Sequence, residues 1–105
     1  MSAQLKKGTL EMCVLAILGQ ADAYAYDIVS RLAAGVEMSE GTIYPLMRRL
    51  QNDALVRTYL AESEQGPPRK YYRLTEAGRR ELAKMKAEWR SFVDEVNRIL
   101  GDDHE

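Results

Sequence analysis

The stretch "GTIYPLMRRLQNDALV", residues 41–56, decides the fold of this chain. Its apolar side chains recur at the i, i+3, i+4, i+7 spacing of one helix face: Ile43, Leu46, Met47 and Leu50. Ser39, just before them, is a suitable N-cap. Pro45 lacks an N–H and clashes with the carbonyl four residues back, that of Gly41. We therefore expect a helix that is bent at Pro45 or that opens with a tighter turn over residues 40–44.

The opposite face of this predicted helix carries groups that suit DNA: Thr42, Tyr44, Pro45, Arg48 and Arg49. Arginine forks onto guanine or clamps phosphates, threonine meets base edges, and a tyrosine hydroxyl donates to phosphate. Pro45 would shape the N-terminal end of the helix, the end that helix-turn-helix proteins present to bases. The alternative is a solvated charged face with a tolerated proline, since paired arginines are common on surfaces.

Two more helices are expected before this stretch. Residues 10–18, LEMCVLAIL, are apolar nearly all round and predict a helix that is buried on most sides. GQADA, residues 19–23, breaks the pattern, and YAYDIVSRLAAG, residues 24–35, resumes it as a second helix. With the helix after residue 39, three short helices precede residue 53.

After residue 53 the hydrophobic period changes from helix to strand. Residues 56–60 and 70–74 predict two strands, joined by a loop that contains Gly66-Pro67-Pro68. Thr75 is the expected N-cap of a last helix, with no breaker between residues 79 and 100. Three helices, a β-hairpin and a further helix predict a mainly α fold with a β-hairpin wing, a winged helix-turn-helix followed by a C-terminal dimerisation helix.

The predicted hairpin carries candidate contacts to phosphates: Gly66, Arg69, Lys70 and Tyr71. Gly66 at the tip permits close approach of the backbone to a ligand. Strand alternation places Tyr72 and Leu74 on the inner face and Tyr71 on the outer one. The alternative is a loop that serves only solubility.

Charge is distributed unevenly along the 105 residues, although the net charge is only -1. Residues 1–38 hold three Lys/Arg and four Asp/Glu, residues 39–80 hold eight and five, and residues 81–105 hold four and seven. The basic middle third therefore contains the helix with Arg48 and Arg49 and the wing. A chain of this length builds one modest core, which favours a binding module over an enzyme.

Few residues in this sequence are suited to catalysis or to metal binding. The one histidine, His104, lies in the acidic end GDDHE with Asp102 and Asp103, and no Walker A, GxGxxG or nucleophile-elbow segment is present. The single cysteine, Cys13, excludes an internal disulfide framework, and no apolar run is long enough to span a membrane. We expect a cytoplasmic protein that is not an enzyme and has no metal site and no cofactor.

The last helix carries a heptad seam in steps of three and four: Leu82, Met85, Trp89, Phe92, Val96 and Ile99. Such a seam needs a partner, and a second copy of the chain is the simplest one. We therefore predict a homodimer with these residues at its interface. An aromatic residue in a seam usually serves packing, which is the first interpretation of Trp89.

Three segments resemble the N-terminal domain of the PadR family of bacterial transcriptional regulators: "LKKGTLEMCVLAIL", "GTIYPLMRRLQNDALV" and "GPPRKYYRLTEAGRREL". The resemblance covers residues 1 to about 82 and also implies a homodimer. The short last helix with Trp89 further resembles the small-sized branch, which includes multidrug-binding repressors. That likeness implies that Trp89 and Phe92 form an aromatic wall for a planar apolar effector.

The expected organisation is a winged helix-turn-helix DNA-binding domain over residues 1–75 and a dimerisation helix with an acidic tail over residues 76–105. The predicted contacts to double-stranded DNA are Ser39, Thr42, Tyr44, Pro45, Arg48, Arg49, Gly66, Arg69, Lys70 and Tyr71. The function predicted is that of a ligand-responsive repressor at an inverted-repeat operator. A winged-helix module that contacts another protein is the alternative, which the acidic last helix supports.

Overall fold

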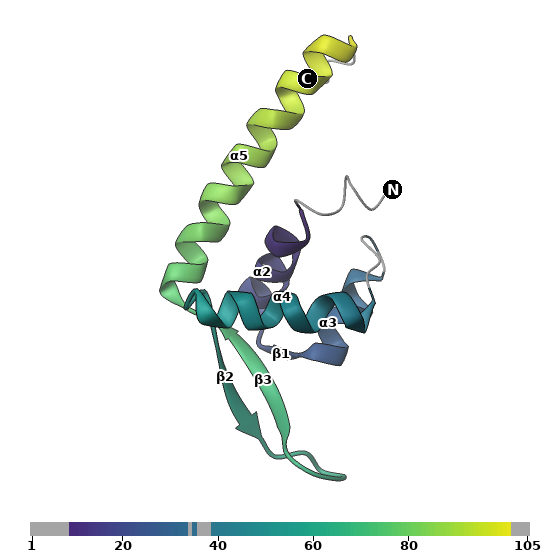
Figure 1. Ribbon diagram of the computed structural model, residues 1–105, viewed down its shortest axis with the longest axis vertical. Helices are drawn as coiled ribbons and strands as arrows, with labels where there is room; N and C mark the ends of the chain where they lie inside the picture. The colour runs from purple at the N-terminus through teal and green to yellow at the C-terminus, as the bar shows by residue number, and fades with distance from the viewer. Residues whose placement is uncertain (1–8, 34, 36–38, 102–105) are drawn as a thin grey trace.

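A computed structural model describes residues 9–33, 35 and 39–101 (Figure 1). Its elements are α2 (Leu10–Gln20), β1 (Ala23–Tyr24), α3 (Ala25–Leu32), α4 (Glu40–Asn52), β2 (Val56–Ala61), β3 (Arg69–Leu74) and α5 (Glu76–Leu100). This order confirms the predicted mainly helical fold with a hairpin wing and a long last helix. The acidic tail with Asp102, Asp103 and His104 lies outside the described residues.

The core lies where α2, α3 and α4 meet the base of the hairpin. Val14 and Leu15 of α2 and Ile28 of α3 are fully buried, in agreement with the apolar patterns of these segments. The predicted inner face of α4 is confirmed, because Ile43, Leu46, Met47 and Leu50 are all buried. Cys13 packs against this core as a small apolar residue, and partial burial raises the pKa of its thiol.

The sheet has the strand order β1-β3-β2, and both pairings are antiparallel. The two predicted strands are present, each one residue longer than expected. The prediction that the second helix begins at residue 24 was wrong, because Ala23 and Tyr24 pair with Tyr72 and Tyr71 of β3 and α3 begins at Ala25. A strand of two residues is defined by its partner, so local periodicity does not reveal it.

The α4 helix runs as an α-helix through Pro45, with Ser39 as its N-cap residue. The Ser39 carbonyl accepts two hydrogen bonds, from the backbone N–H of Thr42 at 3.0 Å and from that of Ile43 at 3.1 Å. The bond to Thr42 spans three residues, as in a tighter turn, but the bond to Ile43 is that of an α-helix, and residues 40–52 form one α-helix. The Ser39 side chain makes no capping hydrogen bond and instead contacts the Thr42 hydroxyl at 3.3 Å.

The base of α5 is joined tightly to the turn between α4 and β2. The hydroxyl of Thr75, the N-cap, accepts from the Gly78 N–H at 3.0 Å and donates to the Ala54 carbonyl at 2.7 Å. The backbone of Gly78 lies so close to this turn that a Cβ there would meet the Leu55 carbonyl oxygen at 2.1 Å. Glycine therefore lets α5 begin in contact with the turn.

Away from this base, α5 extends out of the body of the molecule (Figure 1). Leu82 is buried, and Met85 packs against the chain's own core, so the first two residues of the predicted dimer seam already have partners within the chain. The exposed part of the seam begins at Trp89 and continues through Phe92 to Ile99, which are 42%, 58% and 88% exposed. Among the described residues, no helix is long and apolar enough to cross a membrane.

Replacing Gly78 with alanine is expected to destabilise the fold by about 1–3 kcal/mol, because the new methyl group overlaps the Leu55 carbonyl and forces the base of α5 to shift. The measurement is urea unfolding at a fixed protein concentration. Gly19→Ala is the matched control, since its Cβ would meet Leu82 at an ordinary 3.5 Å. The control should gain up to about 1 kcal/mol from helix propensity. Equal stability of the two variants would contradict the close contact at Gly78.

Candidate nucleic-acid interface

A cleft of about 400 Å³ opens between the start of α3, the α4 helix and the wing. Its lining combines phenol rings with cationic side chains from three separate parts of the sequence: Tyr24, Ala25, Tyr26, Tyr44, Arg48, Arg69, Lys70 and Tyr72. Among the described side chains, no acidic one lines it. A cleft that presents only phenols, aliphatic atoms and positive charge suits a polyanion with stacked bases.

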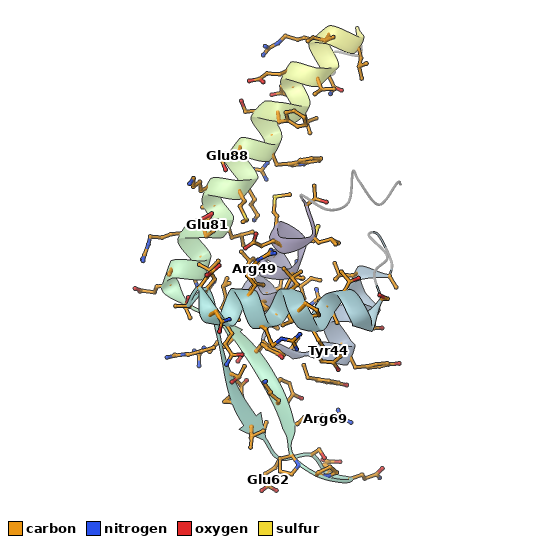
Figure 2. All side chains as sticks on the ribbon, in the orientation of Figure 1. Tyr44, Arg49, Glu62, Arg69, Glu81 and Glu88 are labelled. Atoms are coloured by element: carbon orange, nitrogen blue, oxygen red, sulfur yellow. The ribbon has the colours of Figure 1, made fainter. Side chains whose placement is uncertain are left out.

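The α4 helix contributes Tyr44 and Arg48 to this cleft. Both side chains are exposed, and Figure 2 shows Tyr44 on the side of α4 that faces the wing. Thr42 and Pro45 are exposed as well, near the N-terminal end of the helix. These four predicted residues, with Ser39 at the cap, therefore form a continuous accessible surface at the start of α4.

Arg49 differs from its neighbour Arg48, although the two residues look equivalent in the sequence. Its guanidinium forms an ion pair with the Glu11 carboxylate of α2 at 3.5 Å. Figure 2 shows Arg49 on the side of α4 opposite Tyr44. Successive residues of a helix point about 100° apart, so one arginine turns to the cleft and the next turns to α2. The structure thus separates Arg49 from the cleft.

The wing brings Arg69 and Lys70 to the cleft, and both cations lie over aromatic rings. The guanidinium of Arg69 is 4.7 Å from the centroid of Tyr24, and the ammonium of Lys70 is 5.5 Å from that of Tyr72. Cation–π contacts of this kind orient a side chain and leave its N–H groups free to meet phosphate oxygens. Gly66, with φ of 111°, lies in the loop between the strands and adopts a backbone conformation that favours glycine.

Tyr71, also predicted to contact DNA, does not line the cleft. It is half-buried in a row of rings on the outer face of the sheet, between Tyr24 at 5.4 Å and Tyr59 at 5.7 Å. The alternation prediction is confirmed, because Tyr72 and Leu74 are buried and Tyr71 points to the other face. The ring of Tyr71 is thus engaged by its neighbours in the sheet.

The sequence interpretation missed Tyr24 and Tyr26, which line the cleft from β1 and from the start of α3. The sequence predicts both residues only as part of a helix over residues 24–35. The signal available was the Tyr-x-Tyr spacing at the start of that segment, two large polar aromatics where an N-cap would be expected. Tyr26 is 64% exposed, and its ring stacks against Tyr24 at 6.5 Å. An exposed ring of this kind marks an interaction surface.

Within the described residues, no group of three His, Cys, Asp or Glu side chains is placed to hold a metal ion. The cleft also lacks any paired acid and base or activated nucleophile among its lining residues. What it offers is positive charge, hydroxyl donors and flat apolar surface. This set of groups suits the binding of an anionic, aromatic ligand.

Comparison with known proteins agrees with this geometry. The model of the PadR-like family of transcriptional regulators matches residues 14–84. The chain is similar to a PadR-like transcriptional regulator from Bacillus cereus, with 38% identity, a TM-score of 0.86, and coverage of 93% of this chain and 97% of that one. It is also similar to a PadR-like transcription factor from Bacteroides fragilis, with 45% identity, a TM-score of 0.77, and coverage of 92% and 95%.

A more distant structure is that of Bacillus subtilis PadR in complex with operator DNA, which shares the fold at 22% identity and a TM-score of 0.67 over 73% of this chain and 46% of that one. The match to the family model extends from the core of α2 into the base of α5 and includes all of α4 and the wing. With its winged helix-turn-helix fold and its cationic cleft, the chain therefore belongs to the PadR-like family of transcriptional regulators, which are not enzymes.

Proposed function

We propose that this regulator binds double-stranded DNA as a homodimer at an inverted-repeat operator and represses transcription in response to a small-molecule effector. The observation that carries the proposal is the convergence of Arg48 from α4 with Arg69 and Lys70 from the wing on one cleft, whose described lining residues include no acidic side chain. Three cations around an aromatic cleft supply positive charge that attracts a phosphate backbone.

In this proposal the start of α4 enters the major groove. Ser39, Thr42, Tyr44 and Pro45 form its leading end, and their exposure leaves them accessible to base edges. Arg48, Arg69 and Lys70 then hold the phosphates on either side of the groove, and Gly66 lets the wing backbone approach the duplex. Arg49 contributes mainly to the contact between α4 and α2.

The homodimer rests on the exposed half of the α5 seam. The helix extends beyond the body of the chain (Figure 1), and its seam residues there keep a large exposed fraction: 42% at Trp89, 58% at Phe92, 36% at Val96 and 88% at Ile99. Exposed apolar surface of this extent marks an interface. A two-fold dimer presents its two α4 helices about 34 Å or a multiple of that apart, which calls for inverted half-sites.

The effector part of the proposal rests on Trp89 and Phe92. Both are large, flat and exposed in the single chain, and in a dimer they would face the partner near its axis. Aromatic walls between subunits bind planar apolar molecules. An effector bound there would change the separation of the two α4 helices and thereby the affinity for DNA. Repression follows if the dimer occupies DNA that RNA polymerase requires. Because a bacterial regulator meets its DNA in the cytoplasm, we place the protein there.

The DNA-binding surface is tested by salt titration of three single variants on mixed genomic fragments. Lys70→Ala and Arg48→Ala should each weaken binding to all duplexes and reduce the salt slope by about one unit per subunit, because each removes a phosphate-neutralising charge. Arg49→Ala is the matched control and should leave the slope unchanged, since its charge is directed to Glu11. Wild-type protein that fails to bind any duplex at low salt would favour the protein-interaction module instead.

The dimer is tested by Phe92→Glu, which places a carboxylate in the apolar stripe and should convert the dimer to monomer in sedimentation velocity. Ala87→Glu adds the same charge at an exposed position outside the seam and serves as control. A dimer that persists in Phe92→Glu at micromolar concentration would remove the α5 stripe as the main interface.

The effector site is tested through the fluorescence of Trp89, the one tryptophan of the chain. Planar apolar dyes should quench it saturably, and Phe92→Ala should weaken their binding because one wall of the site is lost. The experiment pairs fluorescence titration with sedimentation, so that loss of the dimer is not mistaken for loss of the site. A panel of dyes without any saturable response would assign Trp89 to packing alone.

A further inference from the structure

A single hydrogen bond connects the outer strand of the wing to the segment before β1. The Tyr59 hydroxyl on β2 donates to the Asp22 carboxylate at 2.6 Å. The two residues lie 37 positions apart in the sequence, and β3 runs between their strands. The side chains therefore reach across about two strand spacings, roughly 9.6 Å.

The ring of Tyr59 lies parallel to that of Tyr71 on the middle strand, at 5.7 Å between centroids and 16° between planes. Tyr71 in turn meets Tyr24 edge to face at 5.4 Å. The three residues are direct partners across the sheet, Tyr59 with Tyr71 and Tyr24 with Tyr71. The hydrogen bond to Asp22 thus closes a row of rings that crosses all three strands.

This connection matters because the edge of the sheet next to the helices is short. Strand β1 pairs with β3 through only two residues, Ala23 and Tyr24. The hairpin otherwise extends away from the helical body (Figure 1). The buried residues Val56, Tyr72 and Leu74 fix the base of the hairpin in the core, so only the part of the wing beyond them can change its angle. At its inner edge that part is restrained by β1 and by the contacts of the tyrosine rings.

We propose that Tyr59 and Asp22 are positioning residues, a staple across β3 that fixes the angle of the wing and so sets the width of the DNA-binding cleft. The inference rests on the DNA-binding function proposed above. Neither residue, nor Tyr71, lines the cleft. The staple therefore acts through Arg69 and Lys70, which follow the wing, and its loss lowers the fraction of molecules whose cleft fits the duplex.

The staple is present at neutral pH. The hydrogen bond to Asp22 raises the pKa of the Tyr59 hydroxyl above its ordinary value of 10.0, with smaller contributions from desolvation and from the carboxylate charge. A raised pKa in the folded state means that the bond contributes fully below the ordinary pKa of tyrosine. Its contribution is lost only as the pH rises through the raised value.

The experiment uses the chain of 105 residues, four single variants and one double variant. Tyr59→Phe keeps the ring stack and removes the donor, and Asp22→Ala removes the acceptor. Asp22→Asn keeps an acceptor oxygen while it removes the charge, which separates the staple from any repulsion between Asp22 and DNA. Thr58→Val deletes a hydroxyl from the adjacent residue of β2, whose cross-strand partner is Tyr72 of β3, and serves as the matched control.

Tyr59→Phe is expected to weaken binding to mixed duplex DNA by about 3- to 10-fold without changing the salt slope, because no phosphate contact is lost. Amide hydrogen exchange in β2 and β3 of the free protein should become faster by a similar factor. In the double variant Tyr59→Phe with Asp22→Ala, the amides of β2 and β3 should exchange no faster than in Tyr59→Phe alone, since both changes break the same bond. Asp22→Asn and Thr58→Val should exchange like the wild type.

Three results would overturn the staple. One is wild-type exchange rates in Tyr59→Phe. Another is a salt slope reduced by about one unit per subunit, which would make Tyr59 part of the phosphate contact. The third is additive effects of the two single changes on exchange. Failure of the wild-type protein to bind DNA would instead count against the proposed function, and the exchange data on the free protein would still decide the staple.

Discussion

The close approach between Gly78 of α5 and the carbonyl of Leu55 is the constraint on which the architecture depends. Leu55 follows Ala54, which has a left-handed backbone with φ of 59°, and the Leu55 carbonyl accepts from the Thr75 N–H at 3.1 Å. The Thr75 hydroxyl closes the same junction from the other side. The end of α4, both wing strands and the start of α5 are thereby joined at one point. The base of the cationic cleft and the start of α5 are consequently held together at this junction.

The parts of the fold that sequence could predict are those set by local chemistry. The inner face of α4 follows from the spacing of its apolar residues, and Thr75 is readable as a cap because its hydroxyl meets an N–H three residues ahead. Strand β1 depends on residues almost fifty positions later and has no periodicity of its own. Leu82 and Met85 fit a dimer seam perfectly well by spacing, yet the chain's own α2 and core cover them.

The sequence could predict which residue types form the candidate site, but it predicted less well which way their side chains point. Exposed cations on α4 and on the wing follow from amphipathic patterns, which identify Arg48, Arg69 and Lys70 as surface groups. The same pattern cannot distinguish Arg48 from Arg49, because the acidic partner of Arg49 is Glu11, 38 residues earlier. Tyr24 and Tyr26 reach the cleft only because β1 pairs with β3 and delivers the start of α3 beside the wing. Long-range pairing determines both outcomes.

Because α5 is long, a small change of angle at its base moves its far end by a large distance. Twenty-five residues of continuous helix extend about 37 Å from the Thr75 junction. A change of 5° in the direction of the helix at that pivot displaces its far end by about 3 Å, close to the size of a methyl group and enough to misalign a packed row of side chains. Conversely, contacts made at Ile99 or Leu100 restrain the angle of α5 at the Thr75 junction far more strongly than equal contacts near Leu82. The most exposed side chains of α5 thus have the longest lever arm over the angle between α5 and α4.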